Sequence, residues 1–204
     1  PTVHIQWNEN TAILSGDQMM IEAYKLLAEV PADKLHKVLR LFNKMATEIC
    51  EGQQYDVDFE SQEHVTIEEY LKMIRLKTSV LLATALQIGS YLAGANEAQQ
   101  EALYQFGINV GLAFQIQDDI LDVWGDPKTF GKAVGGDISC NKKTYVYLTA
   151  QQLADAELAE ELHQWYGSVL DDNTGKIAAV KGIFEQLNVR AACDIVVENY
   201  TQSA

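Results

Sequence analysis

Length, composition and charge exclude several classes of protein. The chain has 204 residues, 48% of them hydrophobic, which is enough to bury a sizeable core and favours one domain, residues 1–204, over two. A formal net charge of −14 repels polyanions and argues against nucleic acid or an anionic membrane surface as the main partner. No apolar run reaches the roughly 18 residues of a membrane span. Three cysteines without metal-like spacing indicate reduced thiols in a cytoplasmic protein.

Apolar residues recur at spacings of three and four, which predicts a chain that is nearly all helix. Pro31 separates the first two helices, and the capping box of Thr66 and Glu69 begins the third. The glycine-rich stretch 124–141 is expected to be largely loop. In chain order, we expect helices over residues 11–30, 32–59, 66–92, 97–123, 142–148, 154–170, 174–186 and 189–204.

The third predicted helix carries a lysine on its buried face. Lys77 and Thr78 occupy positions between the apolar residues of this face. An ammonium group that points inward needs an anion, which is either a carboxylate or a ligand. Two structural explanations remain open, an internal Lys-Asp ion pair and a side chain that extends to solvent.

The second predicted helix shows a similar departure near its end. Its apolar face continues onto Gln53 and Asp56, so polar groups stand where core residues are expected. A frayed and solvated helix end is the alternative explanation.

The fourth predicted helix is apolar on most of its circumference, which predicts burial all round. One stripe carries no apolar side chain and is expected to line a cavity, with its glycines leaving space for a ligand: Gly107, Gly111, Gln115, Asp118 and Asp122. Carboxylates one helical turn apart at the mouth of this cavity suit magnesium, which binds together with substrate phosphates. A solvated acidic helix end is the alternative.

Basic residues follow these aspartates. Lys132 lies in the glycine-rich loop, and Lys142 and Lys143 open the next predicted helix. We expect them to return toward the aspartates, where they would cover and neutralise a diphosphate. Ordinary exposed lysines in a turn remain the other interpretation.

These residues together resemble a known family. The stretch 114–127, followed by Gly131-Lys132, 135–138 and 141–143, is similar to the second aspartate-rich region of the farnesyl and geranylgeranyl diphosphate synthases. Further elements of the family are similar to Gly52-Gln53 with Asp56, to Lys77-Thr78 and to residues 10–17, so that the resemblance covers essentially the whole chain.

The resemblance implies an all-α fold, a bundle of mostly antiparallel helices around a central cavity, normally assembled as a homodimer. In this family Mg²⁺ clamps an allylic diphosphate between two aspartate-rich motifs. The present sequence contains only the second of them. The first motif, its arginine pair and the residues for isopentenyl diphosphate would precede Pro1, so we expect an N-terminally truncated form.

The resemblance also implies metal-binding roles. Asp118 would be the most direct Mg²⁺ ligand, with Asp119 and Asp122 acting directly or through bound water. Gln53 and Asp56 would order the water shell of the metal.

Further residues would contact the substrates. Lys77 and Lys132 would bind the oxygens of the allylic diphosphate, with Lys142 contributing less at the rim. Thr78 and Gln115 would stabilise the allylic cation with their oxygens.

The implied activity is the condensation of isopentenyl diphosphate with an allylic diphosphate, giving a short all-trans product such as farnesyl diphosphate. We expect the truncated chain to be inactive alone. A terpene cyclase would share the helical bundle, but the Lys132 loop and the Gly-Gly-Asp-Ile stretch favour chain elongation. A non-catalytic partner subunit remains an alternative because the first motif is absent. A di-iron carboxylate bundle is disfavoured because Glu-x-x-His pairs are missing.

Overall fold

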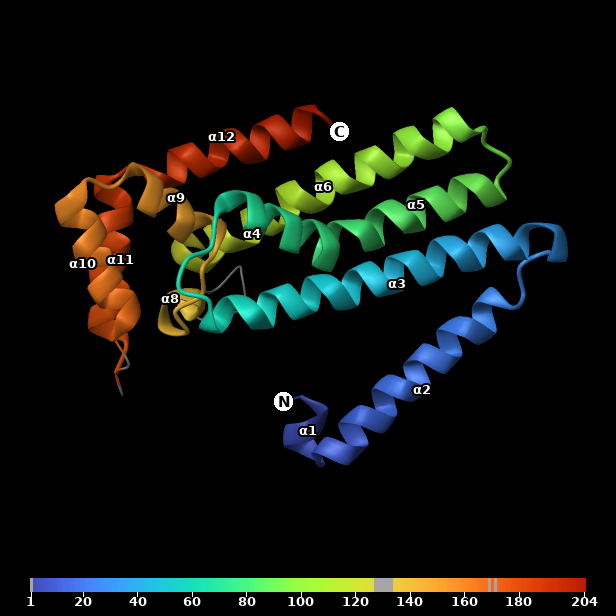
Figure 1. Cartoon of the computed structure of the whole chain (residues 1–204), viewed down its shortest axis with the longest axis horizontal. Helices are drawn as coiled ribbons and strands as arrows, with labels where there is room; N and C mark the ends of the chain where they lie inside the picture. Colours follow the sequence, from blue (N-terminus) through green and yellow to red (C-terminus); the bar gives the residue numbers. More distant parts are fainter. Residues whose placement is uncertain (1, 127–133, 169, 171) are drawn as a thin grey trace. The chain divides into compact units, whose positions relative to one another are not determined.

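The computed structural model describes residues 2–126, 134–168, 170 and 172–204. The described residues form helices joined by turns and loops, and none of them lies in a strand (Figure 1), which confirms the predicted all-α class. None of the described helices is both long and apolar enough to cross a membrane. The chain divides into two compact units, Pro1–Lys44 and Met45–Ala204, and the single domain over residues 1–204 stays a prediction.

The first unit contains α1 (Val3–Gln6), α2 (Glu9–Leu27) and the beginning of α3 (Ala32–Ser61). The Asn8 side chain caps α2 by accepting a hydrogen bond from the Thr11 amide at 2.8 Å. Tyr24 connects α2 to α3, since its hydroxyl donates to Asn43 Oδ1 at 2.6 Å and its ring meets the Phe42 ring edge-on. No residue of α2 is buried in this unit.

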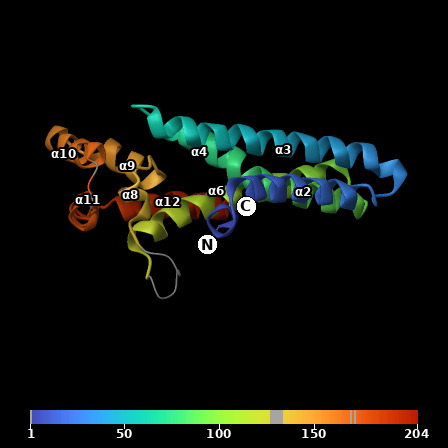
Figure 2. The same cartoon turned by 90° about the horizontal axis from the view of Figure 1, so that it is seen from below.

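The second unit contains the remainder of α3 and the elements that follow it: α4 (Ile67–Ile74), η1 (Arg75–Ser79), α5 (Val80–Leu92), α6 (Glu97–Trp124), α8 (Gly136–Ser139), α9 (Tyr145–Leu153), α10 (Ala156–Gly167), α11 (Thr174–Gln186) and α12 (Val189–Gln202). α5 and α6 run antiparallel, and α12 lies along α6 (Figures 1 and 2). Asn109 Nδ2 donates to the Ser203 carbonyl at 2.9 Å and fixes the end of α12 on α6.

The helix boundaries follow the predicted ones closely in several places. α11 has the predicted bounds, and the capping box of Thr66 and Glu69 is present at the start of α4. α9 begins later than predicted, because residues 142–144 are not helical and Thr144 caps the helix. The predicted loop contains the short helix α8, while residues 127–133 lie outside the described part of the chain.

The third predicted helix is interrupted by the π-helical turn η1, which carries Lys77 and Thr78. Such turns shift the phase of a helix and are frequent at functional sites. α3 approaches this turn closely at Gly52, where a Cβ would lie 2.4 Å from the Lys77 amide nitrogen. A larger residue at position 52 would therefore push α3 away from the turn.

Two expectations for α6 are wrong. A Cβ on Gly107 would lie 2.4 Å from Ala83 Cα, and one on Gly111 would lie 2.5 Å from Ser79 Cα. These glycines let α6 approach α5 and η1, so they leave no space for a ligand. The helix is also not buried all round, because Phe114 is 61% exposed and Phe106 is 41% exposed.

This packing predicts opposite effects for two glycine-to-alanine changes. Gly111→Ala places a methyl group against the Ser79 backbone and should lower the free energy of unfolding by about 1–3 kcal/mol. The matched control is Gly89→Ala in α5, which meets no atom within 4 Å and should be neutral or stabilising by up to about 1 kcal/mol. Chemical denaturation of both variants tests the contrast, and equal effects would contradict it.

Candidate functional site

A cavity of about 440 Å³ lies in the second unit, between α3, α4, η1, α6 and the segment that leads into α9. Acidic, basic and apolar side chains share its wall, and six of the residues predicted from sequence line it: Asp56, Lys77, Gln115, Asp118, Asp119 and Lys142. Phe59, Met73 and Ile74 give it an apolar part. The cavity therefore combines charged groups with a surface that suits a hydrocarbon.

The remaining predicted residues lie elsewhere. Gln53 is exposed on α3 and is not part of the wall. Thr78 and Asp122 are not in the wall, but each hydrogen-bonds a residue that lines it. Lys132 lies outside the described residues.

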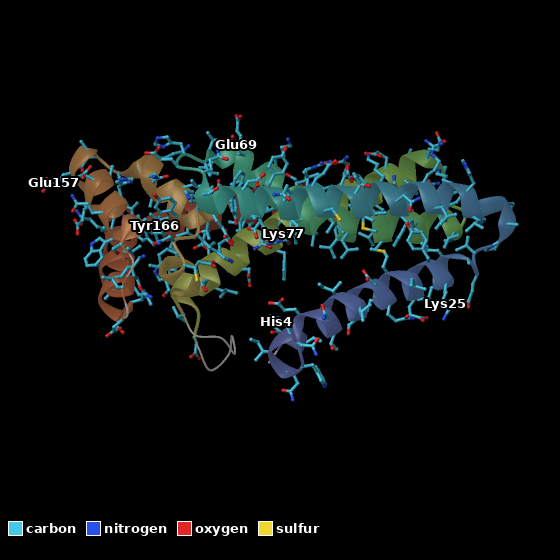
Figure 3. All side chains as sticks on the ribbon, turned by 60° about the horizontal axis from the view of Figure 1, so that its bottom comes forward. His4, Lys25, Glu69, Lys77, Glu157 and Tyr166 are labelled. Atoms are coloured by element: carbon cyan, nitrogen blue, oxygen red, sulfur yellow. The ribbon has the colours of Figure 1, made fainter. Side chains whose placement is uncertain are left out.

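Lys77 meets a carboxylate within the fold. Its Nζ lies 2.7 Å from Asp56 Oδ2, and both side chains are partly buried. Lys77, which Figure 3 labels, lies on η1 and lines the cavity. The inward lysine thus has the ion pair that was one of the open explanations, and the pair stands in the cavity wall.

Asp119 points into the core beside the cavity. It is 4% exposed, and its Oδ2 accepts hydrogen bonds from the Tyr70 hydroxyl at 2.5 Å and from the Tyr145 amide at 3.0 Å. Burial raises the pKa of Asp119 to about 7, although these hydrogen bonds act to lower it. Its carboxylate is therefore already committed to partners within the protein, whereas the adjacent Asp118 has no such hydrogen bond to another described residue.

Gln115 links this carboxylate to the Lys77-Thr78 pair. Thr78 Oγ1 donates to Gln115 Oε1 at 3.0 Å, and Gln115 Nε2 lies 3.4 Å from Asp119 Oδ1. The two contacts fix the orientation of the Gln115 amide in the cavity wall. Tyr70 completes this chain of hydrogen bonds, and the sequence gives no sign of this role because its partner lies 49 positions away.

Residues 135–143, here called the rim segment, are connected to the end of α6. The Gly135 amide donates to the Asp122 carbonyl at 2.7 Å, and the Asp137 amide donates to Asp122 Oδ2 at 3.0 Å. Partial burial and the nearby Asp137 carboxylate raise the pKa of Asp122. Asp122 therefore anchors the rim segment.

The rim segment brings two lysines to the cavity, as predicted. Lys142 Nζ lies 3.5 Å from Asp137 Oδ1. Burial acts to lower the pKa of Lys142, but the attraction of Asp137 and Asp56 outweighs it and raises the pKa. Lys143 Nζ donates to the Phe59 carbonyl at 2.8 Å, and burial lowers its pKa.

The fit of this site to magnesium is partial. No group of three or more His, Cys, Asp or Glu side chains among the described residues could hold a metal ion. Asp118 nevertheless presents a carboxylate at the cavity, and Mg²⁺ is often bound by one or two carboxylates together with substrate phosphates. The residues present therefore suit a metal that is shared with a bound diphosphate.

Comparisons with known proteins agree with this chemistry. The sequence matches the family model described as Polyprenyl synthetase over residues 1–186. It is 41% identical over 169 residues to a short chain isoprenyl diphosphate synthase of Methanocaldococcus jannaschii, covering 82% of this chain and 51% of that protein. The chain spans about half the length of the curated relatives it matches.

Solved structures give the same result. A crystal structure of a geranylgeranyl pyrophosphate synthase is 48% identical with a TM-score of 0.93, covering 98% of this chain and 62% of that one. A geranylgeranyl pyrophosphate synthase from Corynebacterium glutamicum, complexed with isoprenyl diphosphate and magnesium, is 28% identical with a TM-score of 0.86. In that comparison the match covers 97% of this chain and 57% of the other.

Two buried tyrosines allow a test of the Asp119 network. Tyr70→Phe removes a hydrogen bond to a buried carboxylate and should lower the free energy of unfolding at pH 8 by about 1.5–3 kcal/mol. In Tyr104→Phe the lost hydroxyl is also buried but has no hydrogen-bond partner among the described residues, so this control should be neutral or slightly stabilising. Equal losses for both variants in chemical denaturation would argue against the network.

Proposed function

Because the chain belongs to the polyprenyl synthetase family, we propose that it forms part of an active site for the condensation of isopentenyl diphosphate with an allylic diphosphate. The observation that carries this proposal is that Lys77, Lys142 and Asp118 line the same cavity as apolar side chains. A diphosphate needs cationic partners, and its prenyl tail needs an apolar surface. The same wall offers both.

The lysines would bind the diphosphate. Lys77, Lys142 and Lys143 place three ammonium groups in a wall that also holds the carboxyl groups of Asp56, Glu60, Asp118, Asp119 and Asp137. Asp56 holds the Lys77 ammonium at 2.7 Å and keeps it at the cavity before substrate binds. Lys132 belongs to this proposal on the resemblance alone.

Asp118 would hold Mg²⁺ together with diphosphate oxygens, and the metal would supply positive charge that stabilises the leaving group. Asp119, whose oxygens accept bonds from Tyr70 and Tyr145, would keep the adjacent Asp118 in place rather than bind the metal directly. Asp122 would contribute by anchoring the rim segment. Gln53, which is exposed on α3 and is not part of the cavity wall, belongs to this proposal on the resemblance alone.

The reaction would begin with the breaking of the allylic C–O bond. The oxygens of Gln115 and Thr78, oriented by their mutual hydrogen bond, would stabilise the allylic cation. The double bond of isopentenyl diphosphate would then form the new C–C bond, and the released diphosphate would accept the proton that is lost.

The proposal also includes a short all-trans product such as farnesyl diphosphate and a cytoplasmic homodimer. Exposed apolar residues on α2, among them Ile13, Leu14 and Met19, support an association surface in the first unit. The molar mass in solution, measured by light scattering, tests the dimer.

The role of Lys77 can be tested by calorimetric titration of the 204-residue chain with diphosphate and Mg²⁺. Lys77→Ala removes a charged donor from the cavity and should weaken binding by roughly tenfold or more. Lys72→Ala is the control, since this exposed lysine lies on the preceding helix and is not in the cavity wall. If Lys77 only pairs with Asp56, its variant would lose stability while keeping normal affinity.

We further expect the 204-residue chain to bind Mg²⁺-diphosphate without catalysing condensation. The sequence has one aspartate-rich motif, and no described cluster of three ligating side chains could hold the metal by itself. The leaving group would therefore be stabilised from one side only. Geranyl diphosphate and labelled isopentenyl diphosphate are the substrates for this assay, and product at a steady rate would overturn the expectation. Failure to bind Mg²⁺-diphosphate at all would count against the proposed function itself.

A further inference from the structure

Lys176, on α11, is fully buried although it is a lysine. Its Nζ donates hydrogen bonds to Asn141 Oδ1 and to the Ser168 carbonyl, and it lies 5.8 Å from the centre of the Tyr166 ring, which Figure 3 labels. Within the described part of the chain these partners are neutral, and burial lowers the pKa of Lys176. Burying an ammonium group costs free energy, which the hydrogen bonds to these acceptors must offset.

The main partner, Asn141, lies in the rim segment. Its backbone is left-handed, with φ 56°, a conformation that asparagine adopts more readily than most residues. Asn141 lines the cavity together with the residues on either side, Cys140 and Lys142. The hydrogen bond from Lys176 therefore holds the chain at the point where it turns Lys142 toward the cavity.

The next residue of α11 supports the other end of the rim segment. Gly135 has φ 85°, and a Cβ there would lie 2.7 Å from Ile177 Cγ2. The Lys142 amide also donates to the Asp137 carbonyl at 2.9 Å, which closes residues 137–142 into a compact loop. Two adjacent residues of α11 thus contact both ends of the segment.

We propose that Lys176 is a positioning residue for the diphosphate site. Through Asn141 it holds the rim segment so that Lys142 and Lys143 face the acidic wall formed by Asp56 and Asp118. The inference rests on the proposed function, because it assigns to these lysines the binding of a diphosphate. Lys176 itself is not in the cavity wall and acts only through Asn141.

A double-mutant cycle separates this role from a merely structural one. The affinity for inorganic diphosphate with Mg²⁺ is measured by calorimetry for the 204-residue chain, Lys142→Ala, Lys176→Met and the double variant. If Lys176 positions Lys142, Lys142→Ala should weaken binding roughly threefold or more alone, but have little further effect in the Lys176→Met background. If the two substitutions instead lower the affinity by independent factors that multiply in the double variant, the inference is overturned.

Asn141→Gly provides a second route in case Lys176→Met folds poorly. Glycine retains access to the left-handed conformation but removes the acceptor for Lys176. Lys142→Ala should therefore again have little further effect on the affinity in the Asn141→Gly background. Lys181→Met, on the same helix and not in the cavity wall, is the control and should leave affinity unchanged.

Hydrogen exchange of the same variants reports whether the change is local. In Lys176→Met and Asn141→Gly the amides of the rim segment should exchange at least several-fold faster, while those in the middle of α6 stay protected. Faster exchange throughout the unit, or none in the rim segment, would overturn the inference. If the unmodified chain binds no Mg²⁺-diphosphate, the proposed function fails and the inference falls with it. If the unmodified chain binds Mg²⁺-diphosphate but the effects of Lys142→Ala and Lys176→Met on the affinity are independent, the inference is overturned and the proposed function stands.

Discussion

The buried carboxylate of Asp119 joins three helices that are distant in the sequence. Tyr70 on α4 and the amide of Tyr145 at the start of α9 both donate to it on α6. A buried acceptor that loses a partner costs free energy, so these helices are constrained to meet at one point. The cavity lies where they meet. Neighbouring residues on a helix are rotated by about 100°. With Asp119 bound to Tyr70 and Tyr145, the Asp118 side chain therefore points in a different direction and lines the cavity.

In this acidic protein, acceptors of the fold hold the lysines of the cavity in place. Each cavity lysine contacts a protein acceptor: Lys77 meets Asp56, Lys142 meets Asp137, and Lys143 meets the Phe59 carbonyl. These contacts hold the ammonium groups near the cavity. A diphosphate that enters would therefore meet donors whose side chains are already partly ordered, which reduces the entropy lost on binding.

Features that depend on local periodicity were predicted from the sequence. Features that depend on which element packs against a residue were missed. The bounds of α11 and the Thr66 cap follow from spacing and from neighbouring side chains. Gly107 was expected to leave space for a ligand, because a glycine gives no sign of whether a helix or a cavity faces it. Tyr70 and Lys176 were missed for a related reason, since their partners are 49 and 35 positions away. The π-turn had no recognisable sign in the sequence.

Backbone from two helices encloses the stretch from Leu76 to Ala83. α3 approaches it at Gly52, and α6 approaches it at Gly107 and Gly111. Side chains on these enclosed sides have no room to grow, whereas Leu81 and Leu82 are exposed. Along this stretch, larger side chains should thus be tolerated at the exposed positions and not at those that face α3 or α6. Redesign of the exposed leucines would then alter the surface of the second unit without moving the turn that carries Lys77.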